Sequence, residues 1–364
     1  MARKIQSSPF ANERALFVQR NLFTDASPVH ALFSHTQYLR PTDLASIKLE
    51  TVKNAGFDRI VFGNPYSALD AKALYRQARD SGFPRLIIER GALPGTVFLD
   101  EDGFLADSDT YQSNAITSGP DDASSLEELQ TRYLGRPALE PQKNGPVNLS
   151  SSGAFKVLFA LQDSSDTAVQ FQRTPSADYP AFLRTVEAFI SAHSSQFEFY
   201  FKPHPREPDT RIAGAQSLAR TDIINALRTC DAVVTFSSGV GILAMVLGKP
   251  VCFFGNAFYQ NAPGAFPFDG TAQLKAQLTT TPQEKAKSLP FLNHLAASYS
   301  DCSFFGRRAA APSSRDVMCR FTNVKLVHGG KRWQQSINEI WPSVAARSVR
   351  RTLENRLSLT GRSL

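Results

Sequence analysis

The sequence predicts an α/β protein of two doubly wound domains that face each other across a cleft. In the first part of the chain, short apolar runs such as residues 15–18 and 59–62 alternate with helical stretches such as residues 43–55. The alternation stops at a proline-rich stretch and restarts at residue 156. Strands alternating with helices indicate a parallel sheet with helices on its faces, so two runs of the pattern indicate two such domains.

Local signals support each expected element of the first domain. The helix at residues 43–55 has helical apolar spacing and stops at Gly56, and the helix at residues 67–81 begins at a capping serine. Apolar runs predict strands at residues 15–18, 59–62 and 85–89.

The second domain repeats these signals. The helix at residues 179–193 is amphipathic, a shorter helix is expected at residues 222–229, and the helix at residues 239–247 is closed by Gly248. Apolar runs predict strands at residues 156–161, 198–202, 231–236 and 250–254.

Composition places the domain boundaries. Four prolines among Gly, Ser and Asp residues interrupt the chain between the two runs, which is typical of a crossover. We therefore expect a first domain over residues 1–117, a linker over residues 118–152 and a second domain over residues 153–330. Residues 331–364 are predicted to form one or two basic amphipathic helices interrupted at Pro342. These helices either pack on the first domain or contact the anionic inner membrane from one side.

Charge and composition narrow the class of protein. Hydrophobic residues make up 42% of the chain and charged residues 20%, which excludes disorder as the main state. The net charge of +7 favours anionic partners, and no nucleic-acid-binding motif is present, so we expect no nucleic-acid partner. Residues 1–9 lack a secretory signal, and apolar runs such as residues 239–247 are too short to span a membrane. The four cysteines show no CxxC spacing, so we expect reduced thiols in a cytoplasmic protein.

A histidine between two prolines follows one predicted strand of the second domain. Lys202, Pro203, His204 and Pro205 come directly after the apolar run at residues 197–201. Prolines cannot continue a sheet ladder, so the chain must leave the sheet there and hold His204 at the carboxyl end of the strand. An imidazole in that position beside a cation suits hydrogen bonding to a phosphate oxygen. The alternative is a turn with an incidental histidine.

A pair of serines lies between another predicted strand and a helix. Ser237, Ser238 and Gly239 follow the strand at residues 231–236. Hydroxyl groups and free N–H groups at a helix start can hold an anion, with help from the helix dipole. The same serines could simply cap the helix. Because both motifs lie at strand ends of one domain, together they favour a nucleotide-phosphate site.

Carboxylates follow two further strands. Asp163 and Asp166 lie in the loop after the first strand of the second domain, where either could act as nucleophile or base or could cap the next helix. Glu89 ends a strand of the first domain and is expected to face the cleft. Its alternative is a surface carboxylate paired with a neighbouring arginine.

Taken together, these residues resemble the capsule polysaccharide biosynthesis and export family, which includes bacterial β-Kdo transferases. The resemblance runs from roughly residue 15 to residue 259 and departs from the family after Phe258 and Tyr259, where a longer aromatic and glycine-rich stretch is usual. The segments that carry it are Glu89-x-Gly91 with the following Asp-x-x-Gly, Gln162-x-x-x-Asp166-x-x-Val169, Lys202-Pro-His204-Pro205, Ser237-Ser238-Gly239, Gly248-Lys-Pro-Val251 and Gly255-x-x-Phe258-Tyr259.

The resemblance implies a GT-B-like fold of two Rossmann-type domains and a glycosyltransferase reaction in surface polysaccharide biosynthesis. The implied donor is a CMP-activated sugar, Kdo or a related acidic sugar, and the implied acceptor is a glycolipid or polysaccharide. Asp166 resembles the nucleophile of a retaining reaction, and Glu89 is a candidate base. The mechanism needs no metal and no cofactor. The donor site would include Gln162, Lys202, His204, Ser237, Ser238 and Gly239.

Two other functions remain open. A CDP-alcohol phosphotransferase of the teichoic-acid type would need a second histidine as base in the first domain, where His30 and His35 are the candidates. A non-catalytic polysaccharide export accessory protein would need no catalytic carboxylate. If the donor is a keto-acid sugar, its carboxylate requires a cation, for which Arg173, Lys202 and Arg206 are candidates.

Overall fold

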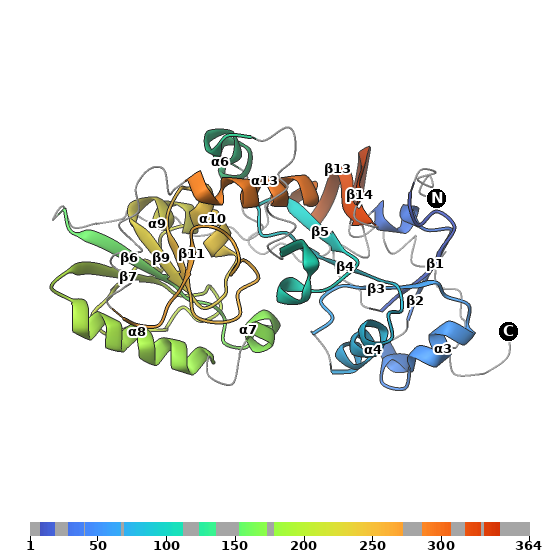
Figure 1. The fold of residues 1–364 in the computed structure, drawn as a ribbon, viewed down its shortest axis with the longest axis horizontal. Coiled ribbons are helices and arrows are strands. Elements are labelled where there is room, and N and C mark those ends of the chain that lie inside the picture. The colour runs from blue at the N-terminus through green and yellow to red at the C-terminus, as the bar shows by residue number, and fades with distance from the viewer. Residues whose placement is uncertain are drawn as a thin grey trace. The chain divides into compact units, whose positions relative to one another are not determined.

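The computed structural model divides the chain into two compact units. The first comprises Met1–Gly91, Gly95–Phe104 and Ser298–Leu364, and the second comprises Ala92–Pro94 and Leu105–Ala297. Figure 1 shows the fold. The described residues are 8–18, 28–39, 41–66, 69–111, 124–135, 153–172, 178–271, 286–306, 317–328 and 331–342.

The second unit is built on a parallel sheet. Its strand order is β11-β10-β9-β6-β7-β8, and every pair of neighbours is parallel. The strands are β6 (Phe155–Ala160), β7 (Phe197–Lys202), β8 (Gln216–Ser217), β9 (Ala232–Thr235), β10 (Val251–Phe253) and β11 (Ala265–Pro267). The helices are α6 (Leu126–Leu134), α7 (Thr167–Gln172), α8 (Tyr179–His193), α9 (Ile223–Thr229), α10 (Val240–Val246) and α13 (Leu289–Ser298), with short 3-10 turns at Leu105–Asp107, Asp109–Tyr111 and Ala286–Ser288.

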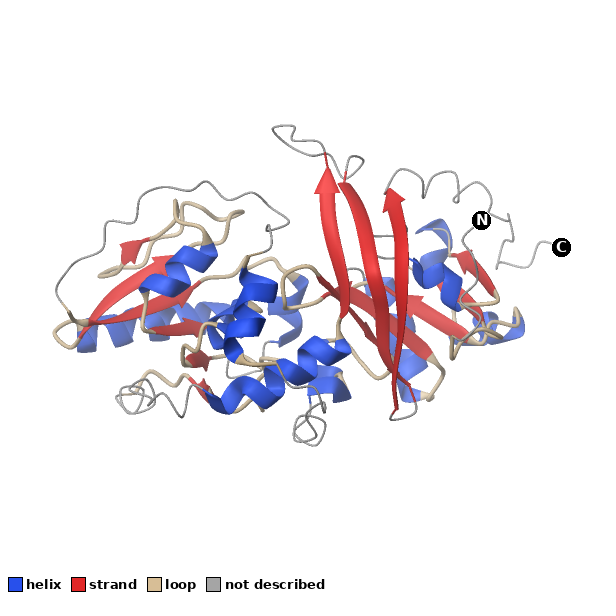
Figure 2. Cartoon of the chain, turned by 90° about the horizontal axis from the view of Figure 1, so that it is seen from above, coloured by secondary structure: helices blue, strands red, loops and turns tan. Residues whose placement is uncertain are grey.

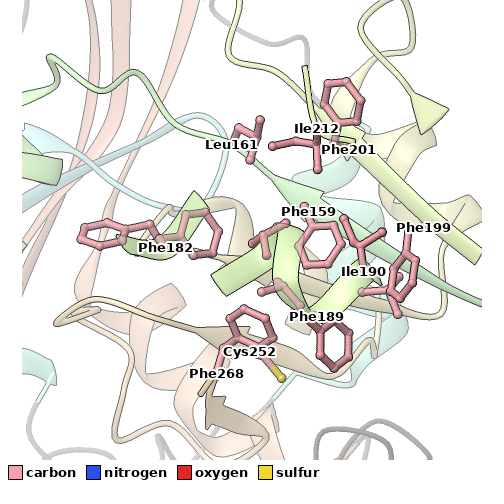
Figure 3. Close-up of a cluster of buried hydrophobic side chains, with 14 of the residues drawn as sticks. Phe159, Leu161, Phe182, Phe189, Ile190, Phe199, Phe201, Ile212, Cys252 and Phe268 are labelled. Atoms are coloured by element: carbon pink, nitrogen blue, oxygen red, sulfur yellow. The ribbon is translucent and has the colours of Figure 1, made fainter. Parts of the chain in front are cut away.

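Helices cover both faces of this sheet, with α8 on one face and α9 and α10 on the other (Figure 1). Successive strand residues point to opposite faces, so Phe159 belongs to one layer and Leu158 to the other, and both are fully buried. Asp178 caps α8 by accepting a hydrogen bond of 2.7 Å from the backbone N–H of Ala181. Phe182 on α8 packs into the apolar cluster with Phe159, as Figure 3 shows.

The first unit contains a mixed sheet of order β14-β13-β12-β5-β4-β3-β1-β2. Strands β1 to β4 are parallel to one another, whereas β5 pairs in antiparallel fashion with both β4 and β12, and β12, β13 and β14 are antiparallel in turn. The strands are β1 (Arg14–Phe17), β2 (His35–Tyr38), β3 (Arg59–Phe62), β4 (Arg85–Arg90), β5 (Thr96–Asp100), β12 (Ser300–Gly306), β13 (Val317–His328) and β14 (Lys331–Pro342). The helices are α2 (Pro41–Leu44), α3 (Leu49–Asn54) and α4 (Leu69–Asp80), with a 3-10 turn at Pro28–Leu32.

The predicted C-terminal helices are wrong over Lys331–Pro342, which forms strand β14. This strand pairs with β13 in an antiparallel hairpin, whose long strands are seen in red in Figure 2. Trp333 packs against the core of the first unit, so burial of apolar side chains in a sheet prevails over the helical spacing. The remaining tail, residues 343–364, and its predicted membrane contact lie outside the described residues.

The predicted domain boundaries also require correction. Ser298–Leu364 joins the first unit rather than the second, because β12 pairs with β5. The described part of the predicted linker is helix α6, which belongs to the second unit. Its Gln130 side chain donates a hydrogen bond of 2.9 Å to the carbonyl of Val246 on α10. The helix begins with a capping box formed by Ser125 and Glu128, a signal that the sequence carries.

None of the helices in the described ranges combines the length and the apolar character that crossing a bilayer requires.

The contribution of the C-terminal strands to the first core can be measured. Phe321 on β13 is fully buried among side chains of the first unit. We expect Phe321→Ala to lower the free energy of unfolding by about 3–5 kcal/mol, because it leaves a cavity. Denaturant unfolding measures this, with Leu69→Ala, at a side chain 85% exposed, as a control that changes little. A loss below about 1 kcal/mol for Phe321→Ala would contradict the packing of β13.

Candidate functional site

Three neighbouring strands of the second unit bring the predicted motifs to one edge. Ala160 at the end of β6 lies beside Lys202 at the end of β7 and beside Thr235 at the end of β9. The loops that follow these strands therefore leave the same edge of the sheet. Adjacent strands lie about 4.8 Å apart, so the ends of β7 and β9 are separated by only about 10 Å. The predicted convergence of the histidine and serine motifs on one sheet edge agrees with this topology.

Gln162 connects the loop after β6 to the loop after β9. Its side-chain Oε1 accepts a hydrogen bond of 2.8 Å from the backbone N–H of Ser237. Its own backbone is held by the hydroxyl of Tyr179 at the start of α8, with N–O and O–O distances of 2.8 Å. Burial raises the pKa of Tyr179 to about 12, so this hydroxyl keeps its proton at neutral pH. The sequence did not predict this role of Tyr179, because no local pattern indicates a contact between residues 17 positions apart.

Asp163 connects the same β6 loop to the loop after β7. This carboxylate is 3% exposed. It accepts hydrogen bonds from the hydroxyl and backbone N–H of Ser165, at 2.6 and 2.9 Å, and from the guanidinium of Arg206 at 3.2 Å. The bonds from Ser165, helped by Arg206 and by the charge of His204, hold the pKa of Asp163 below its usual range.

A second contact ties the loops after β6 and β7 together. Glu207 accepts hydrogen bonds from the hydroxyl and the backbone N–H of Ser164, at 2.6 and 3.0 Å. The loop after β6 is thus held on both sides, by Gln162 on one side and by Asp163 and Ser164 on the other. Such cross-linked loops have little conformational freedom left to lose when a ligand binds.

Asp166, the predicted nucleophile, caps helix α7. Its Oδ1 accepts a hydrogen bond of 2.8 Å from the backbone N–H of Ala168, and its carbonyl accepts one from the backbone N–H of Gln170. The capping alternative that the sequence left open is therefore realised. Within the part of the chain that the structure describes, Oδ2 of this half-buried carboxylate has no partner. Capping therefore fixes the orientation of the carboxylate through Oδ1 and does not use Oδ2.

His204 lies in the turn that follows β7. Its Nδ1 accepts a hydrogen bond of 3.3 Å from the backbone N–H of Arg206, and its carbonyl accepts one of 2.9 Å from the backbone N–H of Glu207. Among the described residues, no group bonds to its Nε2. The ring is half-buried and therefore accessible to a ligand.

The two serines after β9 differ in their surroundings. Ser238 accepts a hydrogen bond of 3.2 Å from the backbone N–H of Val240, which leaves its hydroxyl proton free to donate. Ser237 is 2% exposed, and its hydroxyl has no hydrogen-bond partner among the described residues. A buried hydroxyl without a partner costs about 1–3 kcal/mol, and an anion bound at this edge of the sheet would remove that cost.

The helix after the serines is shorter than the sequence predicted. It spans Val240–Val246, with Gly239 as N-cap and no side-chain cap. A Cβ on Gly239 would have an ordinary contact of 3.6 Å, so space alone does not require glycine there. Gly241 is different, because a Cβ would lie 2.6 Å from the hydroxyl of Tyr259. That close approach packs the fully buried Tyr259 against the first turn of α10.

The predicted cations have different positions. Lys202 is 7% exposed and donates a hydrogen bond of 2.5 Å to the carbonyl of Thr221, so its ammonium is directed to the start of α9. Desolvation lowers the pKa of Lys202. Arg206 keeps 70% of its side chain exposed while bound to Asp163. Arg173 lies outside the described residues.

Glu89 and the candidate histidines of the alternative function belong to the first unit. Glu89 lies on β4 opposite Phe98 of β5, and its carboxylate accepts a hydrogen bond of 2.9 Å from the backbone N–H of Arg90. Both ring nitrogens of the buried His30 are bonded, to Thr36 at 3.2 Å and to Tyr38 at 2.9 Å. His30 is thus a satisfied core histidine, which weakens the case for it as a base. His35 lies on β2, half-buried.

The second unit therefore presents a set of hydrogen-bond donors at one sheet edge. The Nε2 of His204, the hydroxyls of Ser237 and Ser238 and the guanidinium of Arg206 can all donate to an anion. No group of three metal-binding side chains converges within the described ranges. The arrangement suits an anionic ligand such as a phosphate.

Comparisons with known proteins agree with the motifs. Residues 138–305 match the model of the family described as capsule polysaccharide biosynthesis protein. The resemblance stated from the motifs is confirmed, although the match begins and ends later in the chain. Protein FixF of Sinorhizobium fredii is 29% identical over 187 residues, which cover 49% of this chain and 44% of FixF. The match thus spans less than half of that relative.

Two solved structures from Thermosulfurimonas dismutans share the fold. The KpsC β-Kdo 2,4 transferase matches with a TM-score of 0.51 at 16% identity, covering 78% of this chain and 98% of that structure. The KpsC β-Kdo 2,7 transferase matches with a TM-score of 0.50 at 15% identity, covering 76% and 90%. The predicted α/β class and GT-B-like fold are confirmed.

The partnerless hydroxyl of Ser237 gives a test of stability. We expect Ser237→Ala to raise the free energy of unfolding of the ligand-free protein by about 1 kcal/mol, because it removes an unsatisfied buried group. Ser165→Ala is the matched control and should lower it by about 1 kcal/mol, because its hydroxyl is bonded to Asp163. Denaturant titration of both variants decides. A clear loss of stability in Ser237→Ala would mean that the hydroxyl already has a partner.

Proposed function

Because residues 138–305 carry the sequence pattern of the capsule polysaccharide biosynthesis family, we propose that this chain is a glycosyltransferase that uses a CMP-activated sugar. The sugar is Kdo or a related acidic sugar, and the acceptor is a surface polysaccharide or its glycolipid precursor. The reaction takes place on the cytoplasmic side of the membrane, where the nucleotide sugar is available.

One observation carries this proposal. The Nε2 of His204 and the hydroxyl of Ser237, both without a partner among the described residues, follow strands β7 and β9, which flank β6 at one edge of the sheet. A phosphate bound between them would accept a hydrogen bond from each. It would also satisfy the buried hydroxyl, which has no partner among the described residues. Each such donor supplies roughly 2–4 kcal/mol when charge develops on the leaving phosphate in the transition state.

Asp166 is the proposed nucleophile of a retaining reaction. Its Oδ2, which has no partner among the described residues, forms a bond to the anomeric carbon while the bond from that carbon to the phosphate oxygen breaks, and CMP leaves with the bonding electrons. The acceptor hydroxyl then bonds to the same carbon, the aspartate leaves, and the hydroxyl proton passes to a base. Two inversions give net retention. Glu89 stays the predicted base.

Arg206 is the cation that we propose for the carboxylate of an acidic sugar. Its guanidinium carries five N–H donors, and its ion pair with Asp163 uses one of its nitrogens. The remaining N–H donors lie on a side chain that is 70% exposed and is held in place by Asp163. Lys202 is a weaker candidate, because its ammonium is buried against Thr221.

Nucleotide selectivity is the first test. We expect CMP to raise the melting temperature more than CDP, UDP or GDP, with about 2.7 kcal/mol of added stability at 100 times its Kd. His204→Ala should abolish this rise in melting temperature, because it removes a hydrogen-bond donor to the phosphate. His193→Ala is the control, because this residue lies at the far end of α8 and bonds only to Gln196 among polar groups described. A response selective for UDP or GDP would overturn the proposal, and one selective for CDP would favour a phosphotransferase.

The two roles of Asp166 can be separated by variants. Asn caps helices as well as Asp does, so Asp166→Asn keeps the cap but loses the nucleophile. We expect it to keep its stability and to lose more than about a thousandfold in the hydrolysis of CMP-Kdo. Asp166→Ala should lose the same activity and also about 1 kcal/mol of stability. Turnover by Asp166→Asn within tenfold of the unaltered protein would leave Asp166 with the capping role alone.

A further inference from the structure

The turn after β7 determines which nitrogen of His204 carries the proton. His204 to Glu207 form a β-turn closed by the bond from the Glu207 N–H to the His204 carbonyl, at 2.9 Å. Pro205 occupies the second position, where its fixed φ favours the turn. The Arg206 N–H then meets the His204 side chain and donates to Nδ1 at 3.3 Å. A backbone amide can only donate, so Nδ1 is an acceptor, and the neutral ring carries its proton on Nε2.

Side chains of the β6 loop clamp this turn at two points. Asp163 holds the guanidinium of Arg206 at 3.2 Å, and Ser164 holds Glu207 at 2.6 Å. Arg206 and Glu207 are the third and fourth residues of the turn, so side-chain contacts hold the part of the turn that follows Pro205. The charged contact comes from a carboxylate that is itself 3% exposed and immobilised by Ser165. Because this carboxylate is itself fixed, its ion pair with Arg206 restricts the motion of the turn.

We propose that Asp163 is a positioning residue that acts through Arg206 to keep His204 in the Nε2–H form, aimed at the anion that the site binds. The identity of that anion as a CMP phosphate rests on the proposed function, whereas the tautomer of the ring does not. The depressed pKa of Asp163 supports the role, because the clamp stays charged at neutral pH.

Charge balance explains why the clamp is an ion pair. A bare carboxylate beside the site would repel a phosphate, and the guanidinium of Arg206 offsets that charge. Arg206→Ala therefore both releases the turn and leaves the Asp163 carboxylate uncompensated, whereas Asp163→Asn releases the turn and removes that negative charge. We expect Arg206→Ala to weaken CMP binding more than Asp163→Asn does. The double variant, with both changes, should bind CMP more tightly than Arg206→Ala alone.

The tautomer is tested by long-range ¹H–¹⁵N spectra of the full chain with labelled histidine, near pH 8.5, where an ordinary imidazole is neutral. His204→Ala assigns the signal among the six histidines. In the unaltered protein we expect the signals of an unprotonated Nδ1 and a protonated Nε2. In Asp163→Asn both nitrogen signals should shift towards those of the mixture of tautomers that a solvent-exposed imidazole shows. A protonated Nδ1 in the unaltered protein, or identical signals in Asp163→Asn, would overturn the proposal.

Calorimetric titration with CMP tests the functional link. We expect Asp163→Asn to weaken CMP binding about tenfold, the lower end of the effects of residues that orient a functional histidine. In the His204→Ala background the same change should have no further effect, because its influence passes through the ring. Arg211→Ala is the matched control, since among the described residues this exposed arginine of the same loop bonds only to the carbonyls of Pro208 and Thr210.

The outcomes separate the two proposals. Equal weakening by Asp163→Asn with and without His204 would mean general loosening and would overturn the positioning role. If the unaltered protein does not bind CMP but shows the Nε2–H ring and its loss in Asp163→Asn, the clamp stands and the proposed function fails. Should Asp163→Asn not fold, the histidine spectrum of Arg206→Ala tests the same link, because this variant keeps the backbone N–H and the tautomer is read without CMP.

Discussion

The hydrogen bond from the Ser237 N–H to the side chain of Gln162 is the contact on which the candidate site depends. Gln162 leaves the end of β6, the strand that lies between β7 and β9. Through this bond the β6 loop holds the serine loop on one side, and through Asp163 and Ser164 it holds the histidine turn on the other. Without the loop in the middle, the imidazole and the hydroxyl would belong to two independent loops about 10 Å apart. A shared anchor converts them into one preorganised set of donors, which lowers the entropy lost on binding.

That preorganisation has an energetic cost that is visible at Ser237. The hydroxyl is 2% exposed and partnerless among the described residues, although alanine would fill nearly the same space. Residues that reduce the stability of the ligand-free protein in this way concentrate at functional sites, where the ligand restores the missing interaction. The contrast with Ser165 is informative, because that exposed serine has its hydroxyl fully engaged by Asp163. Among the described residues, the buried serine therefore has the hydroxyl that still lacks a hydrogen bond, and the exposed one does not.

Much of the site followed from sequence because parallel strands end at one edge of their sheet. Apolar runs located β6, β7 and β9, and prolines or serines directly after them placed His204 and Ser237 on that edge. Contacts between side chains of different loops could not be predicted, so the bond from Gln162 to Ser237 and the burial of Lys202 against Thr221 emerged only from the structure. The attachment of the C-terminal strands to the first unit was missed for a related reason. Ser300 pairs with Val97, and no local pattern encodes a partner some two hundred residues away.

The two aspartates of the β6 loop show how environment separates roles within one sequence motif. Asp163 is buried, charged and bonded through both oxygens, so it can hold other groups but has no oxygen left for a reacting atom. Asp166 is half-buried and gives one oxygen to the start of α7, which orients the other. A nucleophile needs a fixed carboxylate with one free oxygen, and a clamp needs a carboxylate with none. Because the two carboxylates lie within four residues of each other, displacement of either aspartate would be felt by the other through the loop that they share.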